Sequence, residues 1–153
     1  NPMSIAREGS SCAVLAGKIY AIGGMGLTSV EIYDPATDTW SNGTALPSVT
    51  ERAYAIVVNG LIYLVGGKND SGHNINQVLC FNPSANQWTP KANMPTSRHG
   101  AQLVWFENRI WAIGGNIGGS DSNKVESYDP ATDTWLTESP LITARNWAVA
   151  WVA

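Results

Sequence analysis

Histidine and cysteine are the residues of this 153-residue chain best suited to bind a metal or act as a nucleophile, and the chain has two of each. Cys12 and Cys80 lie in separate apolar, strand-like runs, so they form no Cys-x-x-Cys knuckle, and we expect both to be buried, unpaired thiols. His73 and His99 also lack the spacing of metal ligands. The sequence contains no Gly-x-Ser-x-Gly turn and no phosphate-binding loop. It therefore predicts a protein that is not an enzyme and needs no cofactor.

Arginine is the charged residue whose spacing is most informative. Arg98 and Arg145 each lie ten residues after a tryptophan, and Arg7 and Arg98 each lie 16 residues before a glycine pair. A position that recurs in this way favours a repeated structural bond, for example to a carboxylate or a loop carbonyl. Arg52 lies twelve residues after the preceding tryptophan. When the repeats are aligned, it therefore occupies a different position, which we call a different column. That column is shared with Gly9, Gly100 and Trp147.

Three copies of one sequence pattern position these residues. Each copy has an apolar run that ends in a glycine pair, a second run that ends in an aromatic residue, and a tryptophan seven residues later. The glycine pairs are Gly23-Gly24, Gly66-Gly67 and Gly114-Gly115, the aromatic residues are Tyr33, Phe81 and Tyr128, and the tryptophans are Trp40, Trp88 and Trp135. The copies vary in length mainly between the glycine pair and the aromatic residue. One variable loop on each fixed unit is typical of a recognition surface.

Each copy predicts four antiparallel strands, which we letter A to D. In the second copy we expect them at Ala53–Val58, Leu61–Val65, Asn76–Phe81 and Gln87–Pro90, with a hairpin turn at Asn59-Gly60. The continuous apolar runs of strands A and B predict burial on both faces, whereas strand C predicts half exposure. Because four strands cannot bury two apolar faces alone, the copies must stack side by side.

The pattern resembles the kelch repeat in three features. These are the glycine pair after strand B, the Tyr-Asp-Pro-x-Thr-x-x-Trp stretch after strand C, and a Leu/Met-Pro pair before the next strand A. In the second copy, Leu79 replaces the glutamate found at Glu31 and Glu126. The resemblance implies an all-β fold of kelch-type β-propeller blades, with strand A innermost. We expect blades over residues 4–47, 48–95 and 96–140, and the start of a fourth blade over 141–153.

Three blades are too few to close a propeller, which typically has four to eight. We expect the chain to be either a piece of a longer propeller or a half-propeller that pairs with a second copy to form six blades. In both cases the open, apolar end faces predict self-association, with a homodimer as the simplest form.

Kelch propellers carry the B–C and D–A loops on one face, and the resemblance implies that this face binds a protein or peptide. In kelch adaptors an arginine in the column of Arg52 can bind an acidic peptide through bidentate hydrogen bonds. The candidate partner-binding residues are Arg52, Arg98, His99, Asn69, Asp70, His73, Asn116 and Asp121. The alternative is a carbohydrate-binding or sugar-isomerising kelch propeller with its site in the central channel.

Charge and hydropathy bear on partners and location. The formal net charge of -3 gives no electrostatic reason to expect nucleic acid or an anionic membrane as a partner. No apolar run approaches the roughly 18 residues of a membrane span, and Asn1–Ser11 does not resemble a signal peptide. These features favour a cytoplasmic location.

Overall fold

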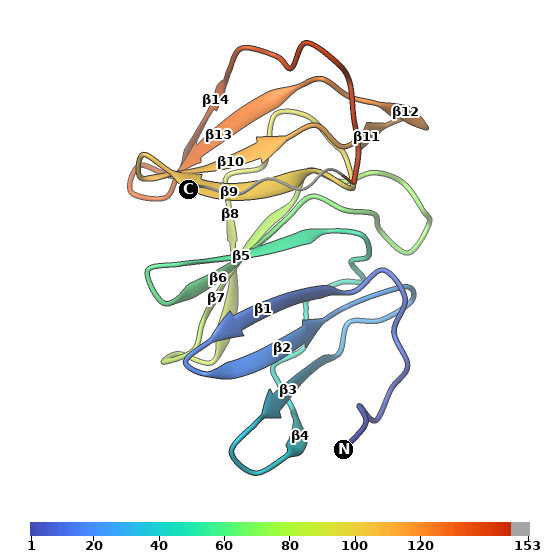
Figure 1. Cartoon of the computed structure of the whole chain (residues 1–153), viewed down its shortest axis with the longest axis vertical. Helices are drawn as coiled ribbons and strands as arrows, with labels where there is room; N and C mark the ends of the chain where they lie inside the picture. Colours follow the sequence, from blue (N-terminus) through green and yellow to red (C-terminus); the bar gives the residue numbers. More distant parts are fainter. Residues whose placement is uncertain (148–153) are drawn as a thin grey trace.

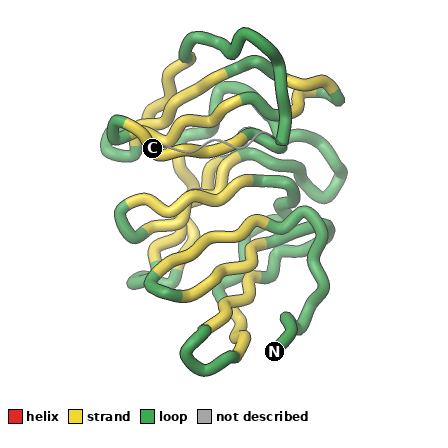
Figure 2. The backbone as a smooth tube through the Cα atoms, in the orientation of Figure 1, coloured by secondary structure: helices red, strands yellow, loops and turns green. Residues whose placement is uncertain are grey.

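Three four-stranded antiparallel sheets make up the structure, a computed structural model in which residues 1–147 are described (Figure 2). The first sheet contains β1 (Ser11–Leu15), β2 (Lys18–Ile22), β3 (Val30–Asp34) and β4 (Thr39–Asn42). The second contains β5 (Tyr54–Val58), β6 (Leu61–Val65), β7 (Val78–Asn82) and β8 (Gln87–Lys91). The third contains β9 (Gln102–Phe106), β10 (Arg109–Ile113), β13 (Val125–Asp129) and β14 (Thr134–Thr137). A small hairpin of β11 (Asn116–Ile117) and β12 (Ser120–Asp121) lies between β10 and β13 in the chain.

Each sheet is a meander in which neighbouring strands pair in chain order. The turn between β5 and β6 has the expected positive φ at both central residues, 50° at Asn59 and 75° at Gly60. Within residues 1–147 there is no helix long and apolar enough to cross a membrane. Of the expected start of a fourth blade over residues 141–153, residues 141–147 form no strand, and residues 148–153 lie outside the described residues.

The three sheets stack side by side as blades 1, 2 and 3, and β5 lies between β1 and β9 (Figure 1). Strand A of each blade is therefore innermost. One hydrophobic cluster fills the space between blades 1 and 2, and a second fills the space between blades 2 and 3. The architecture confirms the predicted all-β fold of propeller blades.

The recurring tryptophans pack each blade against the linker that leads into it. The indole of Trp88 donates to the Thr44 carbonyl at 3.0 Å, and that of Trp135 donates to the Ala92 carbonyl at 2.9 Å. Each ring also packs against the aromatic residue seven positions earlier, with centroids 5.1–5.2 Å apart. The constant seven-residue spacing thus places both rings on paired strands C and D.

The glycine pairs lie where the backbone of the next blade passes closest. The amide of Gly67 donates to the carbonyl of Arg98 at 2.9 Å. A Cβ added at Gly66, where φ is +63°, would lie 2.6 Å from that same carbonyl oxygen. Only glycine fits both the positive φ and the contact.

Two burial predictions were wrong. Strand C is the more deeply buried: β7 is buried over Val78–Phe81, whereas β5 is largely half-buried. The reason is position, because strand C lies inside the sheet between two strands and strand A lies at its inner edge. Cys80 is buried as expected, but Cys12 is exposed, because its face of β1 has no blade against it among the described residues.

Candidate interaction surface

The B–C and D–A segments meet at one end of the stack, which we call the loop end. Backbone hydrogen bonds join the second glycine of each pair to the segment that leads into the next strand A. These bonds run from Gly24 to the Thr50 carbonyl, from Gly67 to Arg98 and from Gly115 to Arg145, at 2.9–3.1 Å. In Figure 1 the loop end lies opposite the β1–β2, β5–β6 and β9–β10 turns.

A groove of about 660 Å³ at the loop end lies between the Lys68–Asn76 loop and the β11–β12 hairpin. We call it the loop groove. It brings together three of the predicted residues, His73, His99 and Asn116, although they come from three separate segments. Its remaining lining residues are Lys68, Gly72, Asn74, Ser97, Ile117, Gly118 and Gly119.

Two linked hydrogen bonds determine which hydrogen-bonding group His99 presents to the loop groove. The Asn74 side-chain amide donates to the Asn116 carbonyl at 2.9 Å, which turns the Asn74 oxygen toward His99 Nδ1 at 2.8 Å. The His99 Nδ1–H is therefore the donor. Burial lowers the pKa of His99, and the charges of Lys68 and Arg52 lower it further. His99 is neutral at pH 7, and its Nε2 is left as a hydrogen-bond acceptor.

The other predicted loop residues lie outside the groove lining. The Asn69 side-chain oxygen accepts hydrogen bonds from the Ser71 and His73 amides, so Asn69 shapes its own loop. Asp70 is exposed at the loop tip. Asp121 is exposed on β12 and accepts a 2.6 Å hydrogen bond from Asn146.

Arg52 belongs to a line of backbone hydrogen bonds that crosses the blades. Its amide donates to Gly9 at 2.7 Å, its carbonyl accepts from Gly100 at 3.3 Å, and the Gly100 carbonyl accepts from Trp147 at 3.2 Å. All four residues have positive φ, between 51° and 67°. The column found in the sequence is thus a repeated backbone contact, and Arg52 and Trp147 adopt a conformation that glycine prefers.

A second hollow of about 210 Å³, the inner cleft, lies along the innermost strands β1 and β5. Arg52 lines it together with Trp147, Tyr54 and Cys12. The Arg52 guanidinium lies 3.8 Å from the carboxylate of the exposed Glu8. Because an exposed pair at this distance contributes little, the guanidinium is available to a partner.

Arg98 is a correction to the predicted set of partner-binding residues, because its side chain is fully buried. Its Nη2 lies 3.1 Å from Glu126 Oε2 and donates to the Ala112 carbonyl at 3.0 Å. Arg7, its counterpart in blade 1, makes the same pair with Glu31 at 2.9 Å. The shared column thus forms a repeated bond inside the blade, as its recurrence indicated, and a partner cannot reach Arg98.

Blade 2 has lost both members of this pair. Thr50 occupies the arginine position and Leu79 the glutamate position, and both are buried. A buried charge without its partner would destabilise the blade. Because blade 2 lacks both charged residues, it avoids this cost.

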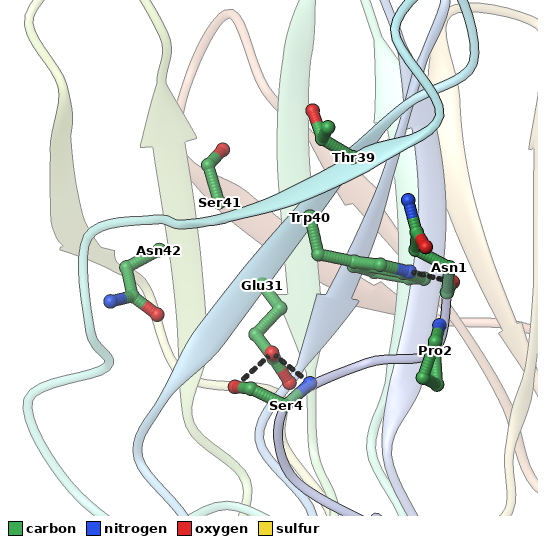
Figure 3. Close-up of a pocket in the computed structure, with 8 residues that line it drawn as sticks. All are labelled: Asn1, Pro2, Ser4, Glu31, Thr39, Trp40, Ser41 and Asn42. Atoms are coloured by element: carbon green, nitrogen blue, oxygen red, sulfur yellow. Dashed lines mark hydrogen bonds between the residues drawn. The ribbon is translucent and has the colours of Figure 1, made fainter.

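A third hollow, of about 420 Å³, lies where the N-terminal segment meets β4 (Figure 3). Two of its polar side chains are already engaged: Trp40 donates to the Asn1 carbonyl at 3.0 Å, and Glu31 accepts from the Ser4 amide at 2.9 Å. Burial alone would raise the pKa of Glu31, but hydrogen bonds from Ser4 and Arg7 outweigh it and hold that pKa at about 2. This hollow is a structural junction rather than a candidate site.

Sequence reasoning missed three residues of the surface. Lys68 and Asn74 line the loop groove, and Trp147 lines the inner cleft. Lys68 directly follows a glycine pair, as the candidate Asn116 does, and that equivalence could have indicated it. Among residues 1–147, no group of three or more His, Cys, Asp or Glu side chains could hold a metal ion.

The comparison with known families decides the classification. The KLHDC2/KLHL20/DRC7 Kelch-repeats domain matches residues 9–146. The chain belongs to the kelch-repeat family. This confirms the resemblance read from the glycine pairs and tryptophans.

Two curated relatives and one solved structure illustrate the similarity. The kelch chain is 33% identical over 131 residues to Kelch-like protein 35 of Mus musculus, covering 83% of this chain and 22% of that protein. It is 28% identical over 166 residues to beta-scruin of Limulus polyphemus, covering 97% and 18%. It spans about a fifth of the length of these relatives. The structure of YjhT matches with a TM-score of 0.79 and 21% identity, over 92% of this chain and 54% of that one, which supports the fold alone.

Proposed function

We propose that this kelch chain is a non-enzymatic interaction module that binds an acidic segment of a partner protein at its loop end. The observation that carries the proposal is the pair of cations Lys68 and Arg52, of which Lys68 lines the loop groove together with His99 and Arg52 lines the inner cleft. Both side chains are partly exposed, and neither is engaged in a buried ion pair. They can therefore attract a carboxylate without breaking a structural contact.

The two cations differ in what they offer a ligand. The Arg52 guanidinium can make two parallel hydrogen bonds to one carboxylate, and the Lys68 ammonium acts as a point charge. His99, held neutral by its surroundings, adds a hydrogen-bond acceptor through Nε2. The resulting site favours an extended segment with acidic side chains and a backbone or side-chain donor between them.

The shape of the loop groove supports a peptide over a compact ligand. Three of its lining residues, Gly72, Gly118 and Gly119, carry no side chain, and open space lies where a Cβ would be at each of them. An open polar groove of this kind can hydrogen-bond an extended chain along its length.

A peptide-display selection on the 153-residue chain tests the proposal. We expect enriched peptides rich in Asp and Glu, whose binding weakens at high salt. Arg52→Ala and Lys68→Ala should each weaken binding roughly 10- to 150-fold, since a hydrogen bond to a charged group contributes roughly 1.5–3 kcal/mol. Lys18→Ala is the matched control, because Lys18 lies beside Asp34 at the opposite end of blade 1 and should bind normally.

A panel of mono- and oligosaccharides provides the contrary outcome. Failure to enrich any peptide, together with sugar binding that Lys68→Ala or Arg52→Ala abolishes, would overturn the proposal.

A further inference from the structure

Arg52 and Trp147 are the two members of their column that carry a side chain. All four members have a left-handed backbone, with φ of 63° at Gly9, 53° at Arg52, 67° at Gly100 and 51° at Trp147. A large residue in this conformation destabilises the fold relative to glycine. Residues strained in this way cluster at binding sites. Glycine would satisfy the fold at both positions, so the two side chains point to a role in binding.

The indole of Trp147 lies with its face over Gly100. A Cβ added at Gly100 would lie 3.4–3.7 Å from three atoms of the indole, so a larger residue at this position would displace the ring. Although one face is covered in this way, Trp147 is 52% exposed. An exposed indole that rests on the backbone offers its uncovered surface to a ligand.

Trp147 also joins the loop groove to the inner cleft. The centroid of its ring lies 6.1 Å from that of His99, in an edge-on arrangement, and 6.1 Å from that of Tyr54. His99 lines the loop groove, whereas Tyr54 and Trp147 line the inner cleft. A ligand that extends from one hollow into the other therefore passes the indole.

The inner cleft has the size of one aromatic ring. Its volume is about 210 Å³, and a cavity of about 150 Å³ is enough to hold a benzene molecule. The lining includes the rings of Trp147 and Tyr54, which favour a third ring in an offset or edge-on arrangement. The Arg52 guanidinium lines the same cleft, so it can bind a carboxylate next to that ring.

We propose that Trp147 anchors the partner by packing against one aromatic side chain of the acidic segment, which enters the inner cleft. A carboxylate beside that aromatic residue binds Arg52, and further acidic residues extend past the indole toward Lys68 in the loop groove. This inference rests on the proposed function and narrows its ligand to an acidic segment with one aromatic residue. Tryptophan and arginine are also the residue types that contribute most to binding at protein interfaces.

Charge favours this ligand over a neutral sugar, whose ring can also pack on an indole. Arg52 lines the cleft together with Trp147, and Lys68 lines the adjoining groove. An acidic segment compensates both cations, whereas a neutral sugar compensates neither.

Isothermal titration calorimetry with three synthetic peptides tests the anchor. The first is Gly-Asp-Glu-Phe-Glu-Asp-Gly, the second has alanine in place of its phenylalanine, and the third keeps phenylalanine but has lysine in place of all four acidic residues. We expect the phenylalanine peptide to bind about tenfold more tightly than the alanine peptide, because only the former buries a ring in the cleft. The lysine peptide should not bind measurably.

Trp147→Gly removes the indole without straining the backbone, since glycine occupies the equivalent positions Gly9 and Gly100. In this variant the phenylalanine and alanine peptides should bind equally well. Phe106→Ala is the matched control, because it removes an exposed aromatic side chain at the opposite end of blade 3, and it should keep the preference for phenylalanine. A preference that persists in Trp147→Gly would overturn the proposal.

The three peptides distinguish failure of this inference from failure of the proposed function. Equal binding of the phenylalanine and alanine peptides to the wild-type chain would overturn the inference and leave an acidic segment as the ligand. Tight binding of the lysine peptide would overturn the proposed function, and its loss in Trp147→Gly would still support the aromatic anchor. Binding of none of the three would overturn both.

Alkylation of Cys12 by iodoacetamide reports on the cleft directly. The Cys12 thiol is exposed, and Cys12 lines the inner cleft. A saturating concentration of the phenylalanine peptide should slow its labelling several-fold, as followed by mass spectrometry, and the alanine peptide at saturation should slow it less. An unchanged labelling rate under saturating phenylalanine peptide would place the ring outside the cleft and overturn the proposal.

Discussion

Arg98 Nη2 lies 3.1 Å from Glu126 Oε2, and both side chains are fully buried inside blade 3. Among the described residues, Arg98 Nε and Nη1 have no hydrogen-bond partner. Arg7, in the equivalent pair of blade 1, donates to Glu31, to Ser29 and to the Gly23 carbonyl. The blade 3 pair is therefore less well compensated for its desolvation than the blade 1 pair.

This difference predicts a large coupling energy. Glu126→Leu alone should lower the free energy of unfolding by about 3–5 kcal/mol, because it leaves a buried guanidinium unpaired. The double change Arg98→Thr with Glu126→Leu, which copies Thr50 and Leu79 of blade 2, should recover most of that loss. Urea denaturation of Arg98→Thr, Glu126→Leu and the double variant measures the coupling energy. Additive losses would contradict the account.

The buried carboxylate of Glu31 should make the stability of the fold sensitive to acid. Its pKa is held at about 2, below its ordinary value of 4.5, so the folded state binds its proton less readily than the unfolded chain. Its contribution to stability is complete above pH 4.5 and is lost as the pH falls toward 2. Denaturation from pH 5 to pH 2 should show a shallower loss in Glu31→Gln than in wild type. Glu107→Gln, in an exposed turn, should follow wild type.

Substitution of Gly66 tests the close approach between blades. Gly66 and Gly118 have similar φ, +63° and +59°, but an added Cβ meets the Arg98 carbonyl at Gly66 and open space at Gly118. Gly118→Ala should cost about 1–2 kcal/mol for the left-handed conformation. Gly66→Ala should cost about 2 kcal/mol more for the clash. Equal losses in thermal unfolding would show that φ alone requires glycine there.

Substitution of Arg52 by glycine should raise stability while it weakens peptide binding. Because its φ is +53°, Arg52→Gly should raise the free energy of unfolding by about 0.5 kcal/mol. The same change removes the guanidinium and should weaken peptide binding about as much as Arg52→Ala does. A variant that loses both stability and binding would instead assign Arg52 a structural role.

The repeat made much of the fold predictable. Strand B of the second copy was expected at Leu61–Val65 and is β6, and strand C was expected two residues early, at Asn76–Phe81. These elements follow local rules, since an apolar run, an Asn-Gly turn and a glycine pair each fix the backbone nearby. The columns of Arg7 and Arg52 were predictable for the same reason.

The site depended on contacts between distant segments, which no local rule supplies. His99, Asn74 and Asn116 converge because two loops of different length meet over a D–A segment. The sequence assigned Arg98 both a structural and a partner-binding role. Its burial against Glu126 depends on tertiary packing, which the repeat pattern does not reveal. The exposure of Cys12 depends on the position of blade 1 at the end of the stack, and a repeat pattern treats all copies alike.

Chemical-shift mapping on the ¹⁵N-labelled chain is the most direct test of the proposed interaction surface. An acidic peptide from the display selection would be titrated into the protein, and amide shifts followed by heteronuclear correlation spectra. The account predicts shifts at Arg52, His99, the Lys68–Asn76 loop and the β11–β12 hairpin, with none at the β1–β2 and β5–β6 turns. Shifts confined to those turns, or spread evenly over all three blades, would contradict it.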